Sequence, residues 1–154
     1  MMQASTATPT PPPPALVAAL KRAQERNREL EAFIHWEDEL FANPYLSGNH
    51  KLELRATRRA VERAQTHDEE GRARINLSTL AHHIGVSPDT MSRGLKLLKA
   101  CGVIASHSLK PEVQEDGTYQ TRHYIRLDEQ RLQHPRDIQP PQPRNHGGNR
   151  YRCQ

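Results

Sequence analysis

Apolar residues recur with a helical period over the first third of the chain. Eight positions step alternately by four and three residues, the spacing of a heptad repeat: Leu16, Leu20, Ala23, Asn27, Leu30, Ile34, Glu37 and Phe41. Three further apolar residues widen this face toward its end: Phe33, Trp36 and Leu40. The pattern predicts one helix over residues 15–43.

The seam of this helix supports two main interpretations. In the first, the helix pairs with its copy in a second chain, and the polar seam residue Asn27 fixes the register. The dimerisation residues are then Leu16, Leu20, Asn27, Leu30, Ile34 and Phe41. In the second, the C-terminal half of the helix packs on the neighbouring domain. The repeat is short and includes the polar residues Asn27 and Glu37. A third possibility is therefore that the helix neither pairs with a copy nor packs on the domain.

The segment NPYLSGNH interrupts the helical pattern, because Asn-Pro and Ser-Gly favour turns. A second helix is predicted from about Asn49 to Gln65. Its expected core residues are Leu52, Leu54, Ala56, Ala60 and Val61. Four arginines make its other face basic: Arg55, Arg58, Arg59 and Arg63. After a polar turn, a short strand is predicted from Ile75 to Leu77.

Residues 77–104 have the pattern of two short helices joined by a tight turn. Ser78 is predicted to cap the first helix, because its hydroxyl can accept a hydrogen bond from a free backbone N–H, and Leu77 can act as a hydrophobic staple. The inner face of this helix consists of Leu80, Ala81 and Ile84. Gly85 is expected to end it, since the turn needs a residue that accepts a positive φ.

The second of these helices has a clear division between faces. Ser87 is predicted to cap it, with Pro88 at the first helical position, where a missing N–H costs nothing. Four residues are spaced to point inward together: Met91, Leu95, Leu98 and Cys101. Six polar residues cannot share that face: Asp89, Thr90, Ser92, Arg93, Lys96 and Lys99. Gly102 is expected to end the helix.

Two runs with strand propensity follow, separated by a turn rich in Pro, Asp and Gly. In the second run two sets of residues alternate: His123, Ile125 and Leu127 on one face, and Arg122, Tyr124 and Arg126 on the other. One face can therefore pack on a core, while the other presents two arginines and a tyrosine to a partner.

The stretch LSTLAHHIGVSPDTMSRGLKLLKACGVI resembles the helix-turn-helix of bacterial, phage and plasmid winged-helix proteins. The matching positions are Leu80, Ala81, Gly85, Val86, Ser87, Thr90, Met91, Arg93, Leu95, Leu98, Gly102 and Ile104. The resemblance covers about half of the chain. It implies a fold that is mainly α with a small β-wing, in which a winged helix-turn-helix domain over residues 46–128 follows an N-terminal helical extension over residues 15–43.

In such proteins the second helix lies in the major groove of DNA and its N-terminal residues reach base edges. The resemblance therefore implies this set of DNA-binding residues: Ser87, Asp89, Thr90, Ser92, Arg93, Lys96 and Lys99 on the helix, with Arg122 and Arg126 on the wing. Arg93 is the candidate for a guanine contact, because its fork matches two guanine acceptors. Lys99 is equally explained by its favourable position at a helix C-terminus. The acidic wing loop, with Glu112, Glu115 and Asp116, departs from the basic tips that grip phosphate.

Composition indicates which parts of the chain lie outside this domain and what kind of partner and location to expect. Only 34% of the 154 residues are hydrophobic, so part of the chain is expected to lie outside a core. Residues 1–14 are a Pro-rich leader and residues 129–154 a basic tail, and both are expected to be disordered. The net charge of +4 mildly favours an anionic partner. The two cysteines suggest no disulfide framework, and no apolar run can cross a membrane, so a cytoplasmic location is expected.

No sequence pattern of an enzyme, a metal site or a cofactor site is found. His82 and His83 are adjacent, so they point to different sides of a helix and lack further ligands at metal-binding spacing. The chain is therefore expected to have no catalytic residues, no metal and no cofactor. The favoured hypothesis is sequence-specific binding of double-stranded DNA, as a transcription regulator or as a plasmid or phage replication or partition factor. The alternative is a winged-helix module for protein–protein interaction without DNA binding, since fold does not fix function.

Overall fold

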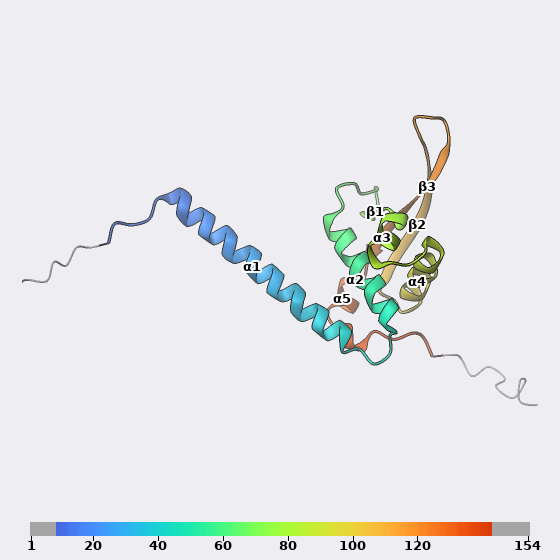
Figure 1. Ribbon diagram of the computed structural model, residues 1–154, viewed down its shortest axis with the longest axis horizontal. Helices are drawn as coiled ribbons and strands as arrows, with labels where there is room; N and C mark the ends of the chain where they lie inside the picture. Colours follow the sequence, from blue (N-terminus) through green and yellow to red (C-terminus); the bar gives the residue numbers. More distant parts are fainter. Residues whose placement is uncertain (1–8, 143–154) are drawn as a thin grey trace, which may run out of the picture. The chain divides into compact units, whose positions relative to one another are not determined.

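The computed structural model describes residues 9–142 (Figure 1). The chain divides into two units, residues 1–36 and residues 37–154, which are treated separately. Helix α1 (Pro14–Phe41) supplies the helical residues of the first unit and contributes its last five residues to the second. It confirms the helix predicted over residues 15–43, apart from one residue at its start and two at its end. The predicted disorder of residues 1–8 and 143–154 falls outside the described residues.

Three helices pack together in the second unit: α2 (Gly48–Arg63), α3 (Leu77–Ile84) and α4 (Pro88–Ala100). The Ser47 hydroxyl caps α2 by accepting a hydrogen bond from the His50 N–H at 3.2 Å. The predicted cap of α4 is confirmed, because the Ser87 hydroxyl accepts from the Thr90 N–H at 3.1 Å. Each cap satisfies a donor that the helix itself leaves free.

A three-stranded antiparallel sheet completes the second unit. Its strands are β1 (Ala73–Ile75), β2 (Ile104–Val113) and β3 (Tyr119–Leu127), in the order β1-β3-β2. Strands β2 and β3 form a long hairpin that projects beyond the helices (Figure 1). Side chains alternate between the faces of a strand, and buried Ile125 and Leu127 place one face of β3 on the core. The predicted core face of β3 is therefore confirmed. The prediction that Tyr124 is presented to a partner on the other face is wrong, because Tyr124 is buried and its hydroxyl donates to Glu112 at 2.9 Å.

The core is centred on α4, whose residues Met91, Leu95 and Leu98 have no exposed surface. Burying a side chain of this size contributes about 1.5–3 kcal/mol relative to leaving it in water. Cys101 is also buried, as predicted. The chain is thus mixed α/β and mostly helical, and its helices with the antiparallel sheet are compatible with a winged-helix-like fold.

The start of α3 differs from the prediction. Asn76, not Ser78, is the capping residue, because its side chain accepts a hydrogen bond from the Thr79 N–H at 3.1 Å. Leu77 is consequently the first helical residue rather than a staple that precedes the cap. The strand predicted over residues 75–77 lies two residues earlier, as β1, because Ala73 and Ile75 pair with β3 and Asn76 already turns the chain into the helix.

The core face of α2 also differs from the prediction. Leu54 is fully buried as expected, but the other expected core residues are only half-buried: Leu52, Ala56, Ala60 and Val61. Glu53 and Thr57 are buried instead, at 1% and 0% exposure. The Thr57 hydroxyl satisfies itself by donating to the Glu53 carbonyl one turn earlier. The helix is therefore rotated so that a carboxyl group faces the interior.

The prediction of a disordered tail from residue 129 onward is wrong for residues 129–138. These residues form α5 (Glu129–Leu132) and the 3₁₀ helix η1 (Pro135–Asp137), and Leu132 and Ile138 are buried. Asn43, in the turn after α1, holds this segment by donating to the carbonyls of Pro135 at 2.8 Å and Ile138 at 2.7 Å. The domain thus extends beyond the predicted range of 46–128 at both ends.

Within residues 9–142, the structure has no helix that combines the length and the apolar character of a membrane span. The longest helix, α1, has 28 residues but carries many charged side chains. The described part of the chain therefore offers no α-helical route across a bilayer.

Candidate nucleic-acid interface

Helices α3 and α4 are joined by a tight turn with defined backbone geometry. Gly85 adopts φ 73° and ψ 30°, a left-handed conformation that residues with a Cβ rarely adopt. The next residue, Val86, donates its N–H to the Ala81 carbonyl at 3.0 Å, which closes the end of α3. The predicted role of Gly85 is confirmed, and the turn fixes where α4 begins relative to α3.

Helix α4 presents its polar side chains away from the core. Asp89, Arg93, Lys96 and Lys99 are exposed, while Thr90 and Ser92 are half-buried. Among residues 9–142, the Arg93 side chain makes one long hydrogen bond, at 3.5 Å from its Nε to the Asp89 carbonyl, so its two terminal N–H groups remain available to a partner. The structure therefore brings together all of the predicted DNA-binding residues of this helix. Their surface carries three cations and one anion.

The side chains of two predicted DNA-binding residues, Ser87 and Thr90, form a hydrogen bond with each other. The Ser87 and Thr90 hydroxyls are hydrogen-bonded at 2.9 Å, in addition to the capping bond from the Thr90 N–H. A hydroxyl that caps a helix still has acceptor capacity left. Ser87 and Thr90 therefore order the N-terminal turn of α4, which is the turn that a helix-turn-helix presents to base edges.

The two wing arginines lie on a different surface. Arg122 and Arg126 alternate with Ile125 and Leu127, so they occupy the sheet face opposite the core. Arg122 Nε lies 3.2 Å from Glu112 Oε2, and Arg126 donates to the Glu70 carbonyl at 3.4 Å. The structure thus does not bring these arginines together with the polar face of α4.

Glu112 is the centre of a charged cluster on that outer face. It pairs with Arg74 at 2.8 Å and accepts a hydrogen bond from the Tyr124 hydroxyl at 2.9 Å, besides its pair with Arg122. Burial alone raises the pKa of Glu112, but the Tyr124 hydrogen bond and the two guanidinium charges outweigh it, so the pKa is lowered. The carboxylate stays ionised and offsets the positive charge of Arg122.

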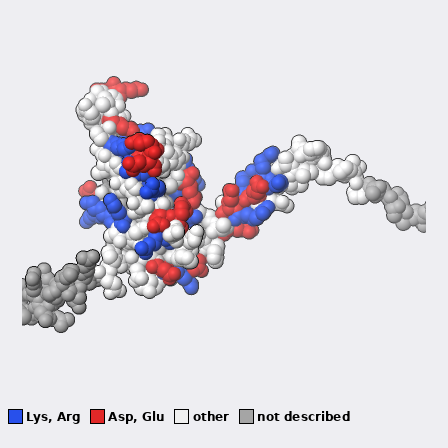
Figure 2. Space-filling view, turned by 180° about the vertical axis from the view of Figure 1, so that it is seen from behind, with Lys and Arg blue, Asp and Glu red and all other residues white. Residues whose placement is uncertain are grey.

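A second charged cluster includes Lys110 of the same outer face. Asp68 pairs with Arg72 at 2.7 Å and with Lys110 at 3.2 Å. Burial raises the pKa of Asp68, but hydrogen bonds from Arg72 and Lys110 lower it well below its usual range. Figure 2 accordingly shows acidic and basic side chains interspersed over the domain, with acidic side chains at the hairpin tip. The outer face therefore has little unpaired positive charge for phosphate.

The inner face of the hairpin holds a histidine pair that the sequence did not indicate. His107 Nε2 lies 3.0 Å from His123 Nδ1, and both rings are half-buried. Burial, with smaller contributions from the charges of His123 and Lys99, lowers the pKa of His107 to about 4. Burial also lowers the pKa of His123. Both rings are neutral at pH 7 and add no positive charge beside α4.

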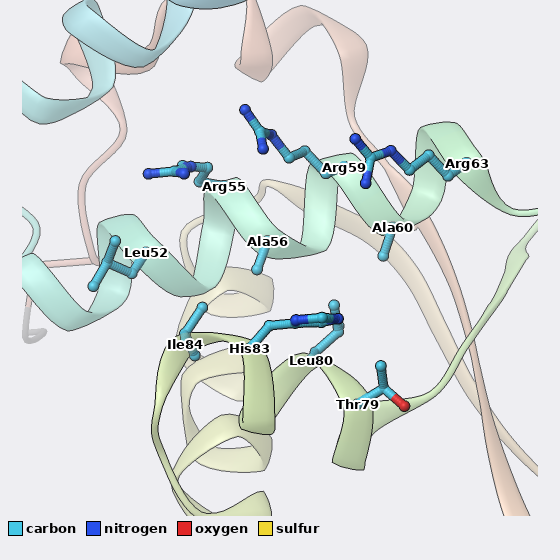
Figure 3. A pocket seen from close by; sticks show the side chains of 10 residues that line it. All are labelled: Leu52, Arg55, Ala56, Arg59, Ala60, Arg63, Thr79, Leu80, His83 and Ile84. Atoms are coloured by element: carbon cyan, nitrogen blue, oxygen red, sulfur yellow. The ribbon is translucent and has the colours of Figure 1, made fainter.

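A groove of about 570 Å³ separates α2 from α3 (Figure 3). Its lining includes Leu52, Ala56 and Ala60 from α2 and Leu80, His83 and Ile84 from α3. Arg55, Arg59 and Arg63 line one side, and two of them, Arg55 and Arg59, pair with Glu37 at 3.0 and 3.1 Å. The sequence predicted the basic face of α2 but not the groove. Two alanines leave a space only where another helix lies opposite them, and the sequence does not show where α3 lies.

The predicted dimerisation residues are exposed in the single chain. In the first unit, Leu16, Leu20, Leu30 and Ile34 are 50–61% exposed, and Asn27 is exposed. In the second unit, Phe41 is 42% exposed, while Leu40 is fully buried. For residues 37–41 the structure confirms that the end of the helix packs on the domain. Pairing with a second chain stays a prediction.

Among residues 9–142, no group of three or more His, Cys, Asp or Glu side chains is placed to hold a metal ion. Comparison with family models, with curated proteins and with solved structures gave no significant match. The arrangement of the side chains is therefore the basis for assigning a function.

Proposed function

We propose that the chain binds double-stranded DNA through the polar face of α4. The observation that supports this most is the division of α4 into two faces. Met91, Leu95 and Leu98 are fully buried, whereas Arg93 and Lys96 are exposed on a helix that follows a left-handed glycine turn. This is the arrangement by which a helix-turn-helix offers its second helix to the major groove.

The exposed cations on α4 have two roles in this proposal. Arg93, one turn from the N-terminus, contacts the O6 and N7 acceptors of a guanine through its planar fork. Lys96 and Lys99 contact phosphates, and Asp89, Ser87, Thr90 and Ser92 set the register near base edges and backbone. The role in the cell is that of a transcription regulator or of a plasmid or phage replication or partition factor. Pairing through α1 would present two such helices to two half-sites.

A second candidate function is supported by the wing. Arg122 is paired with Glu112, Lys110 is paired with Asp68, and the hairpin tip carries Glu115 and Asp116. A wing with this charge gains little from phosphate, and it suits a module that contacts another protein. In that case the polar face of α4 would be an ordinary solvated surface.

A duplex-binding titration at several salt concentrations separates the two functions. Arg93→Ala should weaken binding to the preferred sequence by about 1–3 kcal/mol and relax the preference at one base pair. Lys96→Ala should weaken all sequences alike and reduce the salt slope by about 0.9, one phosphate contact. Lys21→Ala, which removes an exposed cation from α1, is the matched control and should change neither.

The C-terminal residues need a parallel measurement, because residues 143–154 contain three arginines. A chain that ends at Gln142 retains the packed segment up to Ile138 and lacks these cations. It should show a smaller salt slope with the same base preference. If this shorter chain binds duplex without salt dependence, or if Arg93→Ala and Lys96→Ala both leave affinity unchanged, the DNA proposal is wrong and the protein-interaction function is favoured.

A further inference from the structure

Beyond the histidine pair, the inner face of the β2–β3 hairpin carries apolar side chains that are exposed to water. Val113 pairs with Tyr119, and Leu109 pairs with His123, so these residues share the face that buries Ile125 further along β3. Leu109, Val113 and Tyr119 are 58%, 64% and 76% exposed. Apolar side chains grouped on one face of a projecting ribbon indicate a surface that contacts a partner.

The tip of the same hairpin is acidic. Glu115 and Asp116 lie in the turn between the strands, and acidic side chains are visible there in Figure 2. Hydrogen bonds from the Thr118 hydroxyl and N–H lower the pKa of Asp116, so its carboxylate stays ionised. The partner surface should therefore combine an apolar region with positive charge.

The groove between α2 and α3 has this combination. Its base is formed by apolar side chains, and the small side chains of Ala56 and Ala60 leave the space open (Figure 3). Arg55, Arg59 and Arg63 follow one another at intervals of four residues, so they form a row about 12 Å long. Within the chain Glu37 pairs with Arg55 and Arg59, and among the described residues Arg63, which is exposed, makes no ion pair. Three cations beside one carboxylate leave the row with a net positive charge, and Arg63 is its cation for an acidic partner.

We propose that the hairpin of one copy docks into the α2–α3 groove of a second copy. The exposed apolar side chains of the hairpin cover the apolar base of the groove, and the acidic tip meets Arg63 at the end of the arginine row. The hairpin projects beyond the helices of its own domain, which leaves its tip accessible to the groove of another chain (Figure 1).

The two surfaces are different patches of the same molecule, so the contact is head-to-tail and leaves one free hairpin and one free groove at the ends. Such a contact adds further copies as concentration rises. Pairing through α1 uses the same patch on both copies and stops at a dimer. The two modes of self-association can therefore be separated by size.

Sedimentation velocity of the full chain over a range of concentrations tests the proposal. The wild type should grow beyond a dimer. Tyr119→Lys should weaken head-to-tail association about tenfold or more, because it replaces an exposed apolar anchor by a cation that the arginine row repels. Gln120→Lys is the matched control: it adds the same charge one residue away, on the opposite face of β3, and should associate like the wild type.

A groove variant completes the test. Ala60→Glu fills the groove and repels the acidic tip, whereas Asn49→Glu adds the same charge to an exposed position at the start of α2 and serves as its control. Each of the two variants, Tyr119→Lys and Ala60→Glu, retains one intact surface. An equimolar mixture should therefore regain one association step that neither variant shows alone.

Several results would overturn the proposal. The wild type could keep one size over the whole concentration range, Tyr119→Lys could associate like Gln120→Lys, or the mixture could show no new step. A further contrary result is that Tyr119→Lys associates normally but binds duplex more weakly, which would assign the inner face to DNA. Far-ultraviolet circular dichroism checks folding, and Val113→Lys replaces Tyr119→Lys if that chain does not fold.

Discussion

Replacing Glu53 by Gln should change how the stability of the domain depends on pH. Glu53 is 1% exposed, and its Oε2 has no hydrogen-bond partner among the described residues. Burial raises its pKa from an ordinary value of 4.5 to about 7. Gln has nearly the same shape but cannot ionise, so the substitution removes the titration while it keeps the packing against α4.

The sign of the effect follows from the raised pKa. The folded protein holds the Glu53 proton more tightly than the unfolded chain does. The contribution of this proton to the stability is therefore fully present below pH 4.5 and is lost as pH rises through about 7. A pKa of about 7 against 4.5 corresponds to roughly 3 kcal/mol between the two limits. The stability of Glu53→Gln relative to the wild type should therefore increase by about 2–3 kcal/mol between pH 5 and pH 8.

Urea unfolding followed by circular dichroism measures this difference at the two pH values. Gln introduces an amide that also lacks a partner, but this cost is the same at both pH values and cancels in the comparison. Glu62→Gln is the matched control on the same helix, because Glu62 is exposed and pairs with Arg58 at 3.1 Å. It exchanges a carboxylate for an amide at the surface, so it reports any effect of the substitution that does not depend on burial. Equal pH dependence in the wild type and Glu53→Gln would refute the reasoning, since Glu53 would then ionise without cost.

Three further predictions concern packing and assembly. Gly94→Ala should destabilise the domain by about 1–3 kcal/mol, because a Cβ at residue 94 would overlap the Glu53 carboxyl group. Glu53→Ala in the same chain should relieve part of this cost. A double-mutant cycle in which the two effects simply add would contradict the contact. Leu95→Ala should lower the free energy of unfolding by about 2–5 kcal/mol in urea titrations, and an unchanged midpoint would mean that Leu95 is not in the core. Leu20→Lys with Leu30→Lys should abolish pairing through α1 in sedimentation at micromolar concentration without loss of fold, since both side chains are exposed; unchanged association would exclude this seam.

Local chemistry accounts for most of what the sequence predicted correctly. The turn at Gly85 and the cap at Ser87 depend on the backbone of a few neighbouring residues, so the residue types alone indicate them. The inward face of α4 follows from its helical spacing. The cap of α3 was misplaced because Asn76 and Ser78 are both good capping residues, and strand pairing of the preceding residues decides between them.

The features that the sequence did not predict depend on contacts between distant residues. Glu53 is buried because Gly94, on another helix, leaves room for its carboxyl group, and neither residue indicates this alone. Arg122 looked available for phosphate until the hairpin register placed Glu112 beside it. The polar face of α4 could thus be predicted, but the availability of the wing arginines could not.

Asn43 imposes an order on how the domain forms during synthesis. Its amide donates to two carbonyls in η1 and just after it, and its Oδ1 accepts from the N–H groups of Tyr45 and Leu46, so one side chain uses its full hydrogen-bonding capacity. The first two of these bonds span 92 and 95 residues. A ribosome synthesises the chain from its N-terminus, so Asn43 is made long before Pro135 and Ile138. The junction that Asn43 forms with these two residues cannot close until Ile138 has been made. The junction between the two ends of the domain can therefore form only after the helices and the sheet have emerged.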